Sequence, residues 1–384
     1  MKRANGEGTI FKRKDGRWCG EYYDDAPTPK RHILYGKTQA EVRKKLKERQ
    51  MHPGEELSKE SSYTLEKWVL FYLENYKKNE VKETTFNSYM GIYRKHIWKS
   101  KIGSMTLKKI TSNDFQKYYN DKISGKYSAK TIKHIYIIFN CALNKAVQLR
   151  YIHENVNSAV VLPKCQKYYA KVLCADEVAK IFHEAKEEPI YPIIALTMCT
   201  GLRKGEVMAL KWENINFEDK ELYVVGNLCR VTNDTSIESR HTYTSQILTP
   251  KTEESKRTVP LTDIAIEALK IQQRNQKRQQ EEFEEIYVDK GFVFTENDGS
   301  TLKQRGFMDK YHEFLEKYGI SNIRFHDLRH TFASLLLEAG ESPKIIQELL
   351  GHTSITTTMD IYTHISKQSK IKTVKALDDL VKNV

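Results

Sequence analysis

Arginine, histidine and tyrosine recur in three short segments of the second half of this 384-residue chain. Thr-Gly-Leu-Arg-Lys-Gly-Glu contains Arg203, His-Asp-Leu-Arg-His contains His326 and Arg329, and Leu-Gly-His contains His352, with Tyr362 soon after it. A guanidinium group stays charged and can hold two phosphate oxygens in one plane. Residues of these types together are suited to holding a phosphodiester while a tyrosine attacks it.

Each segment alone would be a weak indication. A lone Arg-x-x-Glu is usually a pair on a helix surface, and Tyr362 is one of 22 tyrosines. Cleavage of a phosphodiester by a tyrosine nevertheless requires such cationic residues together. The phosphodiester repels nucleophiles, and its transition state places more negative charge on the non-bridging oxygens. Two arginines stabilise that charge, and Lys251 lies between the first two segments as a further cation.

Glycines mark where the elements that carry these side chains should end. The apolar run over residues 192–200 predicts a helix that ends at Gly201, which places Arg203 at the corner before the next helix. Gly351 is expected to end another helix and to set His352 at that end.

Two further features order the remaining residues. His326 and Arg329 are three residues apart, so they share one face of a helix. Ser354 can cap the following segment, and Tyr362 comes about two turns later. The tyrosine is therefore expected on a short element of its own.

Four motifs occur along the chain in this order: T-G-L-R-K-G-E, P-K-T, H-D-L-R-H-T-F-A-S and L-G-H-T-S-I-T-T-T-M-D-I-Y. In order and approximate spacing they resemble the motifs of the tyrosine recombinase (phage integrase) family, of the arm-binding integrase type found in phages and conjugative transposons. The resemblance is dense in the second half and covers the first half in outline. It implies a catalytic set of Arg203, Lys251, His326, Arg329, His352 and Tyr362.

The resemblance implies a site-specific DNA recombinase that integrates and excises a phage or mobile element through two transesterifications. Tyr362, the nucleophile, would form a 3′-phosphotyrosyl link, with His326 as base or proton relay. Lys251 would protonate the leaving 5′-hydroxyl, and His352 would donate a hydrogen bond to the phosphate. Glu206 is expected to support Arg203. Because the covalent link conserves the bond energy, no cofactor, metal or ATP is expected.

Positive charge is concentrated in the first 165 residues. Residues 1–50 carry +7, residues 61–165 carry +11, and residues 166–384 carry −3, within a total of +13. Such a concentrated excess is typical of a surface that binds nucleic acid. No apolar run approaches the roughly 18 residues of a membrane helix, no signal peptide follows Met1, and six scattered cysteines predict free thiols in the cytoplasm. The DNA-bound protein would associate with the bacterial nucleoid.

Three domains are expected. Residues 1–55 should form a small three-stranded β-sheet plus helix, with a turn at Asp15-Gly16, that binds arm-type DNA; a solvated basic hairpin is the alternative. Residues 62–165 should form an all-α helical core-binding domain, because apolar residues recur at helical spacing. Residues 170–384 should form a mixed α/β, mainly α, catalytic domain with a C-terminal tail helix.

Three segments of the second half carry more specific expectations. Lys251 should lie on a hairpin-like turn between strands at 244–249 and 257–261. Residues 229–243 should form an inserted β-extension of unknown use, and residues 271–290 a solvated helix. The apolar stripe within residues 366–384 predicts a last helix that packs either on its own domain or on a neighbouring protomer.

The implied partners are double-stranded DNA, at core and arm-type attachment sites, and further copies of the chain, as a homo-multimer that is a tetramer on synapsed DNA. DNA-bending and excisionase accessory proteins are implied as well, and no membrane. Two other functions stay open from sequence. A type IB topoisomerase-like enzyme shares the nucleophile chemistry, and a non-catalytic DNA-binding regulator would share the basic surface.

Overall fold

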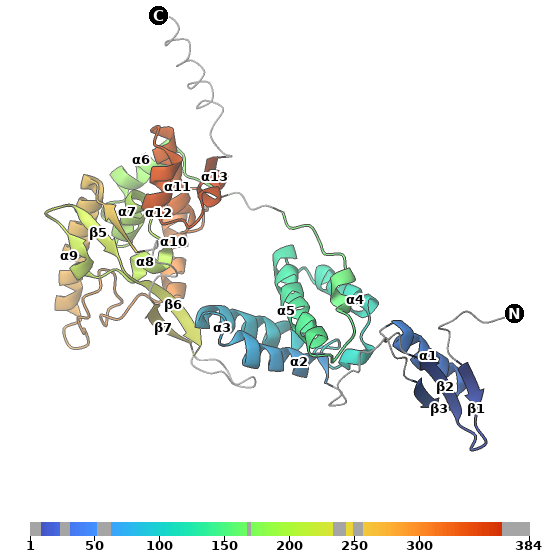
Figure 1. The fold of residues 1–384 in the computed structure, drawn as a ribbon. Helices are drawn as coiled ribbons and strands as arrows, with labels where there is room; N and C mark the ends of the chain where they lie inside the picture. Colours follow the sequence, from blue (N-terminus) through green and yellow to red (C-terminus); the bar gives the residue numbers. More distant parts are fainter. Residues whose placement is uncertain are drawn as a thin grey trace, which may run out of the picture. The chain divides into compact units, whose positions relative to one another are not determined.

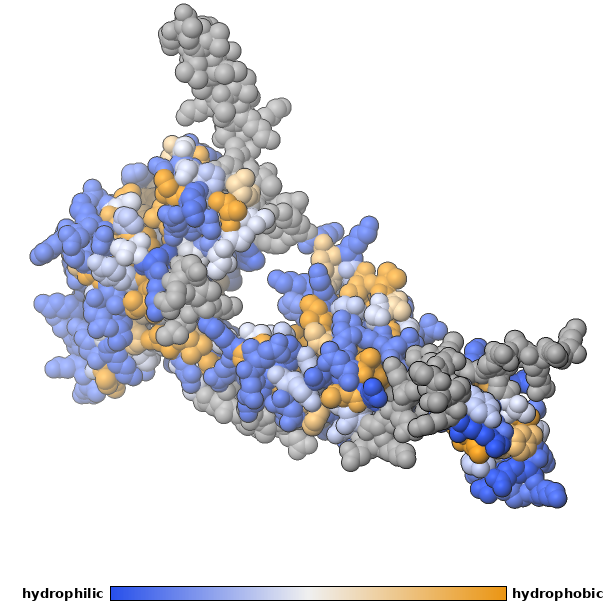
Figure 2. Space-filling view, in the orientation of Figure 1, coloured by the Kyte–Doolittle hydropathy of each residue, from blue (hydrophilic) through white to orange (hydrophobic). Residues whose placement is uncertain are grey.

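The computed structural model describes residues 9–23, 31–51, 63–166, 170–232, 243–248 and 256–362. The chain divides into two compact units, residues 1–166 and 167–384, and Figure 1 labels their α-helices and most of their strands. Lys251, residues 233–242 of the expected extension and the segment 366–384 lie outside the described residues. Hydrophilic residues dominate the described surface seen in Figure 2.

The front of the first unit is the expected antiparallel sheet, in the order β1 (Thr9–Lys12), β2 (Trp18–Tyr23) and β3 (Arg31–Gly36). Helix α1 (Gln39–Met51) packs on one face of it, where Val42 and Leu46 are buried. A Cβ on Gly20 would lie 2.6 Å from Cγ1 of Val42, so the glycine lets helix and sheet approach closely. The prediction of three strands followed by a helix is confirmed.

The rest of the first unit is helical, as predicted. The Trp68 ring lies at its centre, fully buried, and donates from Nε1 to the Ala142 carbonyl at 2.7 Å. Two of the helices continue into single π-helical turns, η1 after α2 and η2 after α3. The helices are α2 (Leu65–Tyr72), η1 (Leu73–Lys77), α3 (Glu83–Ile92), η2 (Tyr93–Ile97), α4 (Ser112–Ser124) and α5 (Ala129–Gln148).

The second unit is mainly helical, with helix α7 at its centre. Nearly every residue of α7 (Tyr191–Thr200) is buried, which explains why its sequence is apolar all round and lacks an amphipathic stripe. Small sheets lie beside the helices. The other helices are α6 (Ala175–Glu184), α8 (Lys204–Met208), α9 (Asp263–Glu282), α10 (Gln304–Lys317), α11 (Asp327–Glu338), α12 (Pro343–Leu350) and α13 (Ile355–Tyr362).

The strands on either side of Lys251 belong to different sheets, which corrects the predicted hairpin. Strand β7 (Tyr243–Leu248) pairs with β6 (Asn227–Thr232), whereas β8 (Arg257–Pro260) pairs with β5 (Glu221–Val224). Strand β5 also pairs with β4 (Ile215–Asn216). The pairing of β8 with β5 places Val259 opposite Leu222, and both side chains are buried. The inserted extension thus forms its own two-stranded ribbon in its described part.

Helix α9 is not solvated on all sides, contrary to expectation. Gln272 donates to the Val293 carbonyl, and Gln276 donates to the Phe292 carbonyl, each at 2.8 Å. Burying an amide is tolerated where its hydrogen bonds are made, so these glutamines face the core. Along the helices in the described part of the chain, none combines the length and the hydrophobicity that crossing a bilayer requires.

Candidate active site

The second unit contains five of the six predicted catalytic residues among its described positions. Side chains are described for Arg203, His326, Arg329 and His352, whereas Tyr362 is described by its backbone as the last residue of α13. Lys251 lies outside the described residues, so its position stays a prediction.

The end of helix α7 positions Arg203. Gly201 follows α7 with φ of +64°, a left-handed conformation that favours glycine. A Cβ at Gly201 would also lie 2.6 Å from Cδ1 of Phe332 and 2.7 Å from Cδ2 of Leu350. The glycine is therefore required twice, by backbone conformation and by space. Arg203 then occupies the N-cap position of α8, at the corner that the sequence predicts.

Glu206 is the carboxylate that holds two arginines together. Its Oε1 accepts from Nη1 of Arg203 at 2.6 Å, and its Oε2 accepts from Nη2 of Arg257 at 3.0 Å. Burial alone would raise the pKa of Glu206, but the ion pairs with Arg257 and Arg203 outweigh it and lower the pKa to about 2. The predicted contact of Glu206 with Arg203 is present, and Arg257 is an addition to it.

Arg329 lies deepest of the three arginines. Its side chain is 1% exposed, and it donates from Nη1 to the Gly201 carbonyl at 2.7 Å and from Nη2 to the Leu350 carbonyl at 2.6 Å. Burial, followed by repulsion from Arg203, lowers the pKa of Arg329 below its ordinary value. Two helix ends that lie far apart in sequence thus meet at one guanidinium group.

Three arginines converge on the end of helix α12. The carbonyls of Leu349, Leu350 and Gly351 accept, in turn, from Arg257 Nε at 2.6 Å, Arg329 Nη2 at 2.6 Å and Arg203 Nη2 at 2.9 Å. A helix C-terminus carries partial negative charge and unpaired carbonyls, so cations bind there favourably. We call these three arginines and three carbonyls the arginine corner.

The same helix end fixes the backbone of His352. Gly351 is left-handed, with φ of +63°, and its N–H donates to the Glu348 carbonyl, while the His352 N–H donates to the Gln347 carbonyl at 3.1 Å. This is the Schellman arrangement of a helix end. The glycine predicted to stop the helix therefore also sets His352 directly beside the arginine corner.

His352 is hydrogen-bonded to helix α13, which carries the predicted nucleophile Tyr362. Its ring Nδ1 lies 2.9 Å from Oγ1 of Thr358, a fully buried residue of α13. Tyr362 follows Thr358 by four residues, about one turn, on the same helix. Burial, together with the charges of Arg329 and Arg203, lowers the pKa of His352 to about 3. The ring is therefore neutral near pH 7.

His326 and His330 lie together at the start of helix α11. His326 occupies the N-cap position and remains exposed on one side, and its ring meets the His330 ring edge to face at 5.3 Å. Cover by the surrounding protein, with the charges of His330 and Arg329, lowers the pKa of His326 to about 4. Asp327 is buried and paired with Arg324 at 2.7 Å, so its carboxylate holds the start of this helix in place.

Sequence reasoning missed Arg257 and Thr358. Arg257 stands in the strand after Lys251, where its contact with Glu206, 51 residues away, leaves no local pattern. Thr358 belongs to the Thr-Thr-Thr run before Met359, and a buried threonine four residues before the tyrosine could have been suspected from helical spacing alone.

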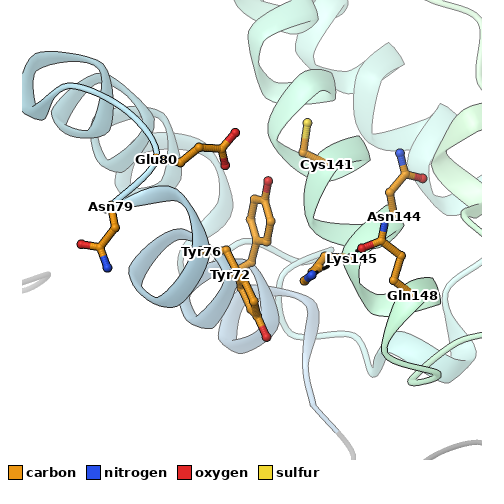
Figure 3. Close-up of a pocket in the computed structure, with 8 residues that line it drawn as sticks. All are labelled: Tyr72, Tyr76, Asn79, Glu80, Cys141, Asn144, Lys145 and Gln148. Atoms are coloured by element: carbon orange, nitrogen blue, oxygen red, sulfur yellow. Dashed lines mark hydrogen bonds between the residues drawn. The ribbon is translucent and has the colours of Figure 1, made fainter.

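A groove of about 530 Å³ lies in the first unit, between η1 and α5 (Figure 3). Tyr72 and Tyr76 stack beside each other there, and Nζ of Lys145 lies 4.6 Å from the centre of the Tyr76 ring. None of the predicted catalytic residues whose side chains are described lines it. The groove lining consists of Tyr72, Tyr76, Asn79, Glu80, Cys141, Asn144, Lys145 and Gln148.

Comparison with protein families agrees with the geometry. The model of the phage integrase family matches residues 171–369, which contain the arginine corner and all six predicted catalytic residues. The model of the phage integrase N-terminal SAM-like domain matches residues 64–123, in the helical part of the first unit.

Similar curated proteins include a bacterial recombinase, a phage integrase and a transposon transposase. A tyrosine recombinase XerC-like protein of Caldanaerobacter subterraneus is 34% identical over 308 residues, covering 78% of each chain. The integrase of Staphylococcus phage L54a is 27% identical over 83% of this chain and 92% of its own. The transposase from transposon Tn916 of Enterococcus faecalis is 25% identical and covers 98% of this chain and 97% of its own.

Two kinds of solved structure share the fold. The Tn1549 transposon integrase in complex with a circular intermediate DNA aligns with a TM-score of 0.66 at 20% identity, over 82% of this chain and all of its own. A lambda integrase dimer bound to a core site aligns with a TM-score of 0.55 at 21% identity, over 94% of this chain and 96% of its own. A lambda integrase tetramer bound to a Holliday junction aligns with the same score and coverage.

Proposed function

The chain belongs to the phage integrase family and is a site-specific tyrosine recombinase that cleaves and religates DNA; from this premise we propose which of its residues perform the reaction. The arginine corner beside His352 is the observation that supports the assignment. Family membership also decides against the topoisomerase and the non-catalytic regulator. The proposed catalytic residues are Arg203, Lys251, His326, Arg329, His352 and Tyr362.

The scissile phosphate binds at the arginine corner. Arg203 keeps about a third of its side chain exposed, at 33%, whereas Arg329 is 1% exposed, so the phosphate meets Arg203 first. A guanidinium group has five N–H donors, and the carbonyls of Gly201 and Leu350 use two of those of Arg329. A small opening of the corner brings a remaining donor of Arg329 to the second non-bridging oxygen, where it stabilises transition-state charge.

His326 takes the proton from the nucleophile. A phenol with an ordinary pKa of about 10 must lose its proton to attack, and a neutral imidazole can accept one. The low pKa of His326 keeps the ring neutral in the DNA-free protein. A bound phosphodiester adds negative charge beside the ring, which raises the pKa of the imidazole and makes it a better base at the moment of attack.

Lys251 protonates the leaving 5′-oxygen. A substrate with sulfur in place of that oxygen needs no such proton, because a thiolate leaves readily. We expect Lys251→Ala to cleave the normal substrate slowly and the sulfur substrate at nearly the wild-type rate. Equal defects on both substrates would remove Lys251 from this role.

Tyr362→Phe tests the whole assignment. The substitution removes only the hydroxyl, so the covalent protein–DNA adduct should disappear while DNA affinity stays within a few-fold, because affinity depends mainly on phosphate contacts elsewhere. Adduct formation is measured on a suicide substrate after denaturation with SDS. The exposed Tyr223→Phe serves as control. An adduct formed by the Tyr362→Phe variant would identify another tyrosine as the nucleophile.

Structures of relatives support two of the proposed partners, double-stranded DNA and further copies of the chain. The lambda integrase structures contain a dimer on a core site and a tetramer on a Holliday junction, and we infer the same double-stranded DNA partner and a tetramer on synapsed DNA for this chain. Residues 1–55 bind arm-type sites, and DNA-bending and excisionase proteins assist. The reaction takes place where bacterial DNA lies, in the cytoplasm.

A further inference from the structure

The contact between His352 and Thr358 joins the phosphate-binding site to the nucleophile helix. Nδ1 of His352 and Oγ1 of Thr358 are 2.9 Å apart, and Thr358 is 0% exposed. Helix α13 packs against α11, which carries Arg329, and against α12, whose last carbonyls belong to the arginine corner. This single side-chain hydrogen bond thus connects the two halves of the proposed chemistry, charge stabilisation and nucleophilic attack.

A neutral histidine can serve the phosphate in only one of its two tautomers. The neutral ring has one N–H donor and one acceptor nitrogen, and the partner of one nitrogen decides the state of the other. With the proton on Nε2, His352 can donate to a phosphate oxygen. With the proton on Nδ1, Nε2 would present its lone pair to that oxygen and repel it.

The surroundings of His352 determine which of its two ring nitrogens carries the proton. In the DNA-free protein, burial and the nearby Arg329 and Arg203 lower the pKa of His352 and keep the ring neutral, so only one of its nitrogens carries a proton before DNA binds. A hydroxyl can donate or accept, and Thr358 can therefore meet Nδ1 as a donor. In that arrangement Nδ1 is the acceptor and Nε2 carries the proton.

We propose that the Thr358 hydroxyl donates to Nδ1 of His352 and so holds the ring in the Nε2–H tautomer that binds the scissile phosphate. Thr358 is a positioning residue that acts through His352. Because it lies one helical turn before Tyr362 on α13, the donor at His352 is set only when the nucleophile helix is docked. The proposal rests on the assignment of His352 given above.

Single-turnover cleavage by full-length variants tests this role. Thr358→Val keeps the shape of the side chain and removes the donor, and we expect about a 10–100-fold loss, as for other partners that orient a functional histidine. Thr358→Ser should restore cleavage to within a few-fold. Thr356→Val is the matched control, because Thr356 is exposed on the same helix with its hydroxyl 2.7 Å from Ser354. Thermal melting identifies any variant that has lost its fold.

A double-mutant comparison separates this role from a general packing effect. If Thr358 acts through His352, adding Thr358→Val to His352→Ala should cause no further loss. Losses that multiply would overturn the proposal, as would wild-type cleavage by Thr358→Val when His352→Ala is defective. Wild-type cleavage by His352→Ala would instead refute the assignment of His352 itself.

Nitrogen NMR on the full-length protein with labelled histidine gives a readout independent of activity. The His352 ring is identified among the 12 histidines by its absence in His352→Ala. We expect the Nε2–H tautomer in the wild type and a mixture in Thr358→Val. An Nδ1–H tautomer in the wild type would refute the proposal.

Discussion

The arginines of the arginine corner and those of the front sheet lie in opposite environments. Arg257 and Arg329 are almost completely buried: the side chain of Arg257 is 6% exposed and the whole residue Arg329 is 1% exposed. Backbone carbonyls accept hydrogen bonds from both. Arg13 and Arg17 on the front hairpin are exposed at 43% and 63%, and both lie over the ring of Tyr35. The first group is held by the protein interior, whereas the second group is exposed to solvent.

This difference shows what a charge contributes in each setting. A buried guanidinium must have its donors satisfied, so the fold provides helix ends whose carbonyls need donors. Removing one member of such a network is costly because its partners stay buried without it. An exposed arginine stays hydrated, and its ion pair with an exposed carboxylate contributes little to stability. Such an arginine can instead contribute to DNA affinity by neutralising a phosphate charge.

Among the arginine substitutions, Arg203→Lys and Arg329→Lys should cause the largest loss of cleavage. Each keeps the charge but replaces a planar fork by a point donor, and cleavage should fall about 10²–10³-fold. The effect is measured as the rate of adduct formation at saturating DNA, with the exposed Arg274→Lys as control. Near-wild-type cleavage by either variant would mean that the arginine corner does not hold the phosphate.

A smaller loss, about 10-fold, is expected from Arg257→Lys, because this residue acts through Glu206 and the Leu349 carbonyl. Lysine cannot keep both contacts at once. DNA affinity should be unchanged, while the melting temperature should fall. A variant that cleaves normally but melts earlier would restrict Arg257 to stability.

The smallest effect on chemistry is expected at the front sheet. Arg13→Gln with Arg17→Gln should leave cleavage of core sites unchanged, yet weaken binding to attachment DNA and flatten its salt dependence by about 0.9 per lost phosphate contact. Affinity is measured at several salt concentrations, and footprinting locates the contacts. If the wild-type protein protects only the core site from cleavage in the footprint, the proposal that residues 1–55 bind a separate arm-type site is wrong.

Local sequence signals predicted the parts that glycine and helical spacing control. Gly201 and Gly351 marked helix ends correctly, because a left-handed residue after a helix is a local requirement. The same two glycines correctly predicted that Arg203 and His352 lie just after the ends of these helices. The apolar spacing of the first unit likewise predicted its helices, since each stripe is buried within one domain.

Contacts between distant segments could not be predicted in this way. Strand β8 alternates as strands do, but alternation does not say whether β5 or β7 is its neighbour. Their polar side chains made Gln272 and Gln276 look like surface residues in the sequence. Both can be buried because each donates a hydrogen bond to a backbone carbonyl of a segment further along the chain. The role of Arg257 depends in the same way on Leu349, 92 residues away.

The arginine corner also sets an order of events during synthesis. Arg203 and its acceptor at Gly351 are 148 residues apart, which a ribosome adding roughly 5–20 residues per second covers in about 7–30 seconds. Throughout that interval Arg203 has been made but the helix end whose carbonyl accepts its hydrogen bond has not. Tyr362 is the last of the six proposed catalytic residues to be synthesised. If Tyr362 is the nucleophile as proposed, an unfinished chain on the ribosome is therefore unable to cleave DNA.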